Sequence, residues 1–292
     1  MHTVGDWLLQ LAIGTSFGLL LFLLASGFTL TFGLARFVNL AHGAVFLVAA
    51  YVATNVGGPG WRFLLGVLAA TAVGLVLSLA TYGLARLRWQ RMSTDSLRQV
   101  FLTFGVLLLL ADLARWHWDG LPRSLAAPAA LDGSVSLGGA TFPGYRLFLI
   151  GAVLLLALGL WWLQDRTRFG ALVRAGVDDP QMLEATGVRP GPVFIGVFAL
   201  SGLLAGLAAG LGAPILGAAM GQEFEVLVLA LVIVVLGGPG SLQGAFAASL
   251  LVGLVDALGK ALLPAFAGFT MMALVVVVLA IRPQGIAGRA EP

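Results

Sequence analysis

The chain has 292 residues, of which 60% are hydrophobic and only 10% are charged. Soluble proteins carry about 25% charged residues, so this composition excludes a soluble domain and predicts an all-α, polytopic bundle of membrane helices. The formal net charge of +3 comes mostly from arginines in short polar segments, which indicate orientation in a bilayer and no nucleic-acid partner. Without cysteine, disulfides and thiolate metal sites are excluded.

Nine apolar runs predict about eight to ten transmembrane helices in one domain, residues 1–292. In chain order the runs cover about residues 7–32, 44–56, 62–85, 99–118, 145–164, 192–212, 224–236, 245–263 and 265–281.

The polar segments between these runs give the orientation. Residues 86–98 hold four arginines and one aspartate, which places them in the cytoplasm by the positive-inside rule. Residues 119–144 are rich in Gly, Ser, Ala and Pro and are expected to form an extracytoplasmic loop. An odd number of crossings places the two ends of the chain on opposite sides of the membrane, so the N-terminus is expected outside.

A polar island, residues 165–189, carries eight charged residues between apolar blocks and is expected in the cytoplasm. Asp178 and Asp179 before Pro180 are typical of a helix start. We therefore predict a short helix over residues 180–186 that ends at Gly187.

Catalytic signatures are absent from the sequence. No HExxH is present, and residues 253–260 resemble a phosphate-binding loop with the wrong glycine spacing and without its Ser/Thr. We expect no enzyme activity, no metal site and no cofactor, so any energised work needs ATP bound by another subunit.

Four stretches, spread over nearly the full chain, carry a resemblance to a known family. They are Phe37-Val38-Asn39-Leu40-Ala41-His42-Gly43; Arg174-Ala175 with Asp179, Met182 and Gly187-Val188; Leu236-Gly237-Gly238-Pro239-Gly240-Ser241 followed by Gly244-Ala245; and Arg282-Pro283-Gln284-Gly285-Ile286 with Gly288-Arg289. Together they resemble the LivH/LivM-type permeases, the membrane subunits of ABC importers for branched-chain amino acids and related solutes.

The resemblance implies an assembly in the bacterial inner membrane. A second, homologous permease would complete the translocation path, as a hetero- or homodimer. Two ATP-binding cassette subunits would dock on the cytoplasmic loop, residues 165–191, and a periplasmic solute-binding protein would deliver the solute. The residues implied in ATPase coupling are Arg174, Ala175, Asp179, Met182, Glu184 and Gly187; Glu184 departs from the small or apolar residues that the family more often has.

Polar residues and paired helix breaks indicate the solute path. Asn39 and His42 are three apart, hence on one helical face, and should face the bundle interior; Asn39 bonding a neighbouring helix is an equal alternative. Gly43 adjoins them. The Gly237-Gly238 stretch is a second break, in the other half of the chain, and paired breaks are typical of a translocation site.

Thr103 and Gly105 form a TxG pattern that the family also shows. The simpler interpretation is that the Thr103 hydroxyl bonds its own helix backbone. Asp256 and Lys260, at i and i+4, are expected to form an ion pair, with a proton relay as the alternative.

Two other functions stay open. A secondary transporter or channel working alone would need carboxylates deep in several helices, and only Asp256 is a candidate. An intramembrane hydrolase could use Ser16, Ser26 or Ser201 with His42 as base, but no spacing links them. The solute could be a branched-chain or other amino acid, an amide, urea or an aromatic acid.

Overall fold

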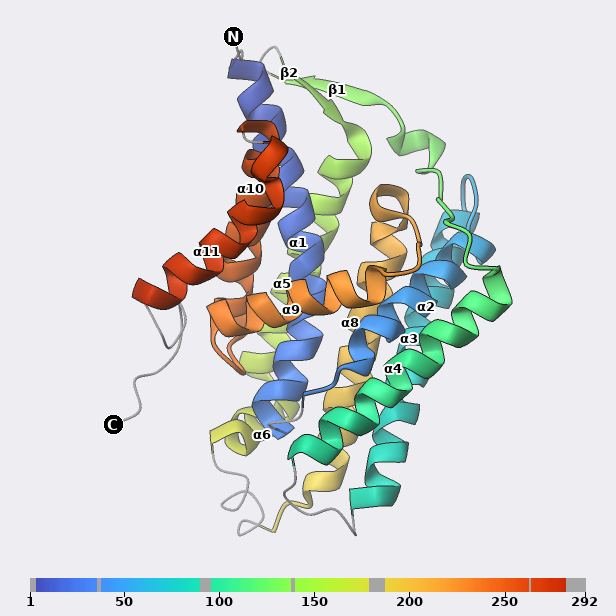
Figure 1. Cartoon of the computed structure of the whole chain (residues 1–292), viewed down its shortest axis with the longest axis vertical. Helices are drawn as coiled ribbons and strands as arrows, with labels where there is room; N and C mark the ends of the chain where they lie inside the picture. Colours follow the sequence, from blue (N-terminus) through green and yellow to red (C-terminus); the bar gives the residue numbers. More distant parts are fainter. Residues whose placement is uncertain are drawn as a thin grey trace.

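A computed structural model describes residues 4–35, 38–89, 96–137, 140–178, 187–262 and 264–281. These residues form the following elements (Figure 1): α1 (Val4–Ala35), α2 (Ala41–Val56), α3 (Arg62–Trp89), α4 (Ser96–Trp118), η1 (Ala129–Leu131), β1 (Ser134–Leu137), β2 (Ala140–Pro143), α5 (Gly144–Arg166), α6 (Arg168–Asp178), α8 (Pro190–Leu216), α9 (Gln222–Gly237), α10 (Leu242–Leu262), η2 (Pro264–Phe266) and α11 (Ala267–Ile281).

Each of the nine apolar runs of the sequence is a helix, so the polytopic helical bundle is confirmed. Within the described residues six helices are long and apolar enough to cross a membrane: α1, α3, α4, α5, α8 and α10. The other three, α2, α9 and α11, have 16, 16 and 15 residues. A perpendicular crossing takes about 20 residues, so these three are shorter than a full span.

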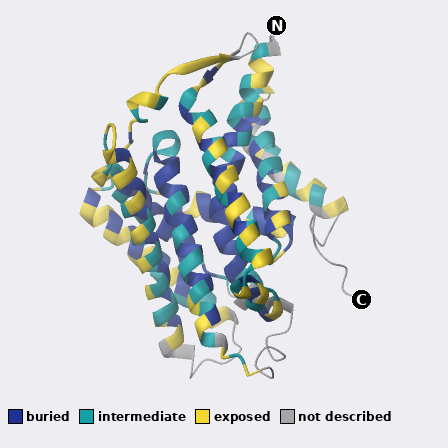
Figure 2. Cartoon of the chain, turned by 180° about the vertical axis from the view of Figure 1, so that it is seen from behind, coloured by how far each residue is buried: buried dark blue, intermediate teal, exposed yellow. Residues whose placement is uncertain are grey.

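The centre of the bundle is formed by α1 and α8. In an apolar stretch of 18 residues in each helix, 56% and 61% of the residues are buried in α1 and α8, against 22% in α4 and α5. Figure 2 shows the buried residues gathered inside the bundle and the exposed ones on its outer faces and ends. The outer faces are apolar, with Leu109, Leu155 and Val228 more than half exposed, as expected of surfaces that meet lipid.

Glycines bring two pairs of long helices into backbone contact. A Cβ added to Gly253 on α10 would lie 2.5 Å from Gly18 N on α1, and one added to Gly74 on α3 would lie 3.0 Å from Gly206 N on α8. Lipid tails remove the hydrophobic driving force between membrane helices, so close approach of small residues holds them together. We call these contacts the α1–α10 seam and the α3–α8 seam.

The seams relate two three-helix units. In each unit a long helix is followed by a break, a 16-residue helix and another long helix: α1–α2–α3 and α8–α9–α10. The first helix of each unit packs against the last helix of the other. α1 runs away from the N-terminal end of the molecule and α8 returns toward it, so the units are inverted (Figure 1).

The two ends of the bundle agree with the expected orientation. The N-terminal end of α1 and the β1–β2 hairpin lie at one end, and α6 lies at the other (Figure 1). The hairpin, with Ser134 opposite Pro143, lies in the segment that the sequence indicated only as a loop. That loop is tied to the α8–α9 break by two backbone hydrogen bonds between Arg123 and Ala218, of 2.8 and 2.7 Å.

Candidate functional site

The start of α2 is fastened to both central helices by His42. Its Nε2 lies 3.0 Å from Leu24 O on α1, and its Nδ1 lies 3.3 Å from Ser201 Oγ on α8. A carbonyl oxygen only accepts, so Nε2 carries the proton and Nδ1 accepts from the Ser201 hydroxyl. Both side chains are at most 1% exposed, so this contact locks three helices together.

This contact joins two of the four residues considered for a hydrolase. Ser16 and Ser26 instead bond carbonyls of their own helix, Ile13 O at 2.9 Å and Leu23 O at 2.8 Å. The Ser201–His42 pair is enclosed by the bundle, and a hydrolytic dyad needs access for its substrate and water. The pair therefore acts here as an interhelical hydrogen bond.

The side chain of Asn39, just before α2, is buried, and its amide has no hydrogen-bond partner among the described residues. It is 1% exposed, and neither its Oδ1 nor its Nδ2 has a partner among the described residues. Among the described residues no neighbouring helix bonds the Asn39 amide, so the alternative of an interhelical bond gains no support there. A buried polar group left unpaired costs about 1–3 kcal/mol, so such a group in a native protein calls for an explanation.

Thr103 of α4 closes one side of the same break. Its Oγ1 lies 3.0 Å from Gln99 O in its own helix, as the sequence predicted, and 3.2 Å from Val38 O, next to Asn39. Thr103 is fully buried. Gly105 faces away from the break, since a Cβ added there meets nothing within 4 Å.

Gly43 brings the first turn of α2 against the first turn of α9. A Cβ at Gly43 would collide with Glu223 O and lie 3.0 Å from Leu227 Cβ. Glu223 is 4% exposed, and its Oε2 accepts a hydrogen bond from Gly221 N at 2.8 Å. Two short helices thus begin side by side in the protein interior, where the positive ends of their dipoles favour polar or anionic groups.

Gly237 and Gly238 lie at the other end of α9. Gly237 ends the helix against α10, where its Cβ would lie 2.5 Å from Gly244 C, and Gly238 has φ 91°. Ser241 Oγ accepts from Gly244 N at 3.0 Å and caps α10. Gly237 is 14 residues from Glu223, about 21 Å along a helix, so the two predicted breaks do not meet. A pathway role for these glycines stays a prediction.

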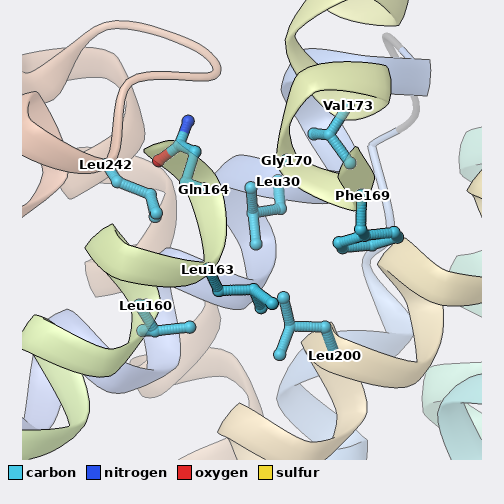
Figure 3. A pocket seen from close by; sticks show the side chains of 9 residues that line it. All are labelled: Leu30, Leu160, Leu163, Gln164, Phe169, Gly170, Val173, Leu200 and Leu242. Carbon is cyan, nitrogen blue, oxygen red and sulfur yellow. The ribbon is translucent and has the colours of Figure 1, made fainter. Parts of the chain in front are cut away.

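The polar island holds a helix, α6, in its first half, where the sequence had not predicted one. Phe169 and Val173 of α6 face Leu30 of α1 and Leu200 of α8 around a small apolar pocket (Figure 3). A Cβ at Gly196, near the start of α8, would lie 2.5 Å from Phe169 Cε2. Apolar residues at i, i+3 and i+4 give α6 one buried face.

The charged side of α6 is turned outward. Arg174 lies 3.5 Å from Asp165 Oδ1 and donates to Gln164 O, with its side chain 42% exposed. Ala175 is exposed. Gly187 has φ 83°, the left-handed conformation that suits the predicted end of a helix. The other expected coupling residues, Asp179, Met182 and Glu184, and the predicted helix over 180–186 lie outside the described residues.

Three charged residues of functional interest were not singled out from the sequence. Glu223 and Glu225 open α9, and Arg146 lies in the first turn of α5. In the sequence all three lie beside long apolar runs, and an ionisable residue in a membrane helix is a functional-site hypothesis by default. A search of the sequence for charged residues beside apolar runs could have identified them. The Asp256–Lys260 ion pair was predicted and is confirmed, at 2.7 Å.

Comparisons with known proteins agree with this architecture. The family model described as "Branched-chain amino acid transport system / permease component" matches residues 10–281. The chain is 28% identical to the high-affinity branched-chain amino acid transport system permease protein BraD of Pseudomonas aeruginosa, over 100% of this chain and 99% of that protein. It is 26% identical to LivH of Escherichia coli strain K12, a permease protein of the same kind of system, over 98% and 96%.

One further relative is named for another solute. The fructose import permease protein FruF of Bifidobacterium longum is 25% identical, over 77% of this chain and 61% of that protein. No solved structure matches the chain. The six long apolar helices and the full-length relatives make it a multi-pass protein of the bacterial inner membrane. The chain belongs to the family of permease components of branched-chain amino acid transport systems.

Proposed function

We propose that this chain is one of two permease subunits of an ABC importer. The second permease would complete the solute path, two partner ATPases would bind and hydrolyse ATP, and a periplasmic binding protein would deliver the solute. We further propose a branched-chain amino acid as the solute, because the relatives that match nearly the whole chain are named for these amino acids.

The observation that carries the proposal is the docking of α6. An amphipathic helix that is firmly seated on the bundle and polar on its outer side is suited to bind a partner protein by rigid contact. Phe169 of α6 rests on Gly196 of α8. Ser201, bonded to His42, is five residues further along α8, about 7.5 Å. Movement of α6 would therefore reach the start of α2 through a single helix.

The start of α2 is the proposed solute contact within this chain. The Asn39 amide has both an acceptor and a donor free among the described residues, so it would bond a solute carboxylate or ammonium group in a conformation of the transport cycle that opens this buried position. Thr103 and His42 fix its surroundings. Gly43 allows α9 to pack directly beside it.

The direct test is uptake by proteoliposomes that contain this chain, a partner permease, the ATPases and the binding protein. We expect L-leucine accumulation only with internal ATP and all subunits present. Accumulation by this chain alone, driven by an ion gradient, would establish the secondary transporter instead.

The coupling role is tested separately at Gly187. A valine there must adopt a φ that β-branched residues strongly disfavour, which costs about 1–3 kcal/mol and distorts the segment after α6. We expect the Gly187→Val variant, and a deletion of residues 180–187, to insert normally but to lose ATP-dependent uptake. Gly191→Ala, at a nearby glycine where a Cβ meets nothing within 4 Å, is the matched control. Wild-type uptake by the deletion variant would refute the coupling role.

A further inference from the structure

A second polar region lies apart from Asn39, in a cavity between α1, α5, α9, α10 and the end of α8. Its volume is about 250 Å³, room for roughly eight water molecules at about 30 Å³ each. Six polar residues line it: Gln10, Arg146, Gln222, Glu225, Asp256 and Lys260. The rest of its wall is apolar and includes Ile13, Phe17, Val226 and Leu229.

The four charged residues of the cavity are not all paired. Lys260 Nζ lies 2.7 Å from Asp256 Oδ2, so these two charges neutralise each other. Arg146 Nη1 donates to the Ser16 hydroxyl at 2.8 Å, and within the described part of the chain no carboxylate lies in ion-pair distance of it. Glu225 likewise has no cationic partner there. Among the described residues, the cavity thus has one cation and one carboxylate without an ion-pair partner, and its four charges sum to zero.

The cavity lies toward the end of the bundle that carries the N-terminus. Gln10 belongs to the first turns of α1, Arg146 to the first turn of α5 and Lys260 to the last turn of α10. All three helix ends are at the end opposite α6 (Figure 1). In the expected orientation this is the periplasmic side, where a binding protein would release its solute.

We propose that this cavity is a receiving site for a zwitterionic amino acid with an apolar side chain. The guanidinium of Arg146 would bind the α-carboxylate, and the carboxylate of Glu225 would bind the α-ammonium group. Ile13, Phe17, Val226 and Leu229 would contact the side chain. A neutral zwitterion matches the balanced charge, whereas a free anion or cation would leave either Glu225 or Arg146 without a counter-charge. The proposal rests on the proposed import of amino acids and adds the recognition chemistry.

The absence of cysteine from the sequence permits a clean test. Ile13→Cys places one thiol in the cavity wall, and a membrane-impermeant sulfonated maleimide is added to spheroplasts that express the complete transporter. We expect labelling from outside, and L-leucine at about ten times its Kd should slow that labelling about tenfold. Asp132→Cys, on the exposed outer loop, is the matched control and should be labelled at the same rate with or without leucine.

The two charged contacts are tested in the Ile13→Cys background. Glu225→Gln removes a charge-assisted bond and should raise the half-protecting leucine concentration about tenfold to one-hundredfold. 4-Methylpentanoate, which lacks the ammonium group, and leucinamide, which lacks the carboxylate, should protect poorly. Equal protection by either compound would overturn the zwitterion assignment.

The remaining outcomes are equally decisive. The receiving site would be overturned if the thiol at position 13 were not labelled, or if leucine did not change the labelling rate. Either result would also be expected if a zwitterionic lipid headgroup filled the cavity. Leucine uptake is measured on the same cells. Leucine uptake without protection of the thiol by leucine would contradict this inference alone. Absence of ATP-dependent uptake would contradict the proposed function.

Discussion

The 16-residue helices α2 and α9 begin beside each other, but the polar side chains at their starts differ in hydrogen bonding. At the start of α9, Glu223 and Gln222 are satisfied within the chain: Glu223 accepts from Gly221 N, and Gln222 bonds Ala219 N and Leu216 O. At the start of α2, the side-chain amide of Asn39 has no hydrogen-bond partner among the described residues. The units share the same glycine seams, so the difference does not come from the architecture. We propose that Gln222 and Glu223 of α9 provide a fixed wall and that the Asn39 amide at the start of α2 is available to bind a ligand.

The largest effect is expected where the two helix starts touch. Gly43→Val should lower the free energy of unfolding by about 3 kcal/mol or more, because the new side chain would collide with the Glu223 backbone. The thermal unfolding midpoint of the detergent-purified protein measures this. Gly105→Val, where a Cβ meets nothing within 4 Å, should leave the midpoint nearly unchanged. Equal midpoints for both variants would mean that α2 and α9 do not touch.

Removing the satisfied carboxylate at α9 should be next in size. Glu223→Leu leaves the Gly221 N–H unpaired and should cost about 1–3 kcal/mol of stability. Glu223→Gln keeps an acceptor oxygen in place and should recover more than half of the loss. Thermal midpoints again give the comparison, and a glutamine variant as unstable as the leucine variant would contradict the fixed wall.

The link between α8 and α2 should have a smaller effect on stability and a specific one on transport. Ser201→Ala removes one interhelical hydrogen bond, worth about 0.6 kcal/mol on average in membranes. Ser249→Ala, which removes a bond to Phe246 O within one helix, is the matched control. We expect only the Ser201 variant to hydrolyse more ATP per leucine transported. The same ratio in both variants would show that coupling does not pass through His42.

The smallest stability effect, and the most informative, is expected at Asn39. Asn39→Leu removes a buried amide that has no partner in the described structure, so stability should change by less than about 0.5 kcal/mol or even rise. Leucine uptake should nevertheless fall about tenfold if a charge-assisted bond to the solute is lost. A variant as unstable as Glu223→Leu, with normal uptake, would mean that the two helix starts are equivalent.

The sequence predicted the elements far better than it predicted their contacts. Nine apolar runs became nine helices because the bilayer leaves an apolar segment few other choices. The Asp256–Lys260 pair followed from spacing on one helix. α6 was missed because its apolar positions, Phe169, Leu172 and Val173, are diluted among charges, and the acidic Asp178-Asp179 start drew the prediction to the residues that follow.

The candidate site depended on long-range contacts. Ser201 and His42 are 159 positions apart, and nothing local in either segment marks the other as its partner. The pairing of Gly43 with Glu223 has the same origin. The sequence did indicate that Asn39 and His42 face inward, because polar groups avoid lipid. That the His42 side chain is hydrogen-bonded, while the Asn39 amide has no partner among the described residues, could be seen only from the packing of three helices.

The forty glycines of this chain are not equivalent, and this bears on how the protein can vary. In the two seams, at positions such as Gly74 and Gly253, even one added methyl group would strike another backbone. At Gly83, Gly151 and Gly159 the same methyl group would meet nothing within 4 Å. Substitutions that persist over generations should therefore collect on the outer faces, while each seam mutates only when both of its helices change together.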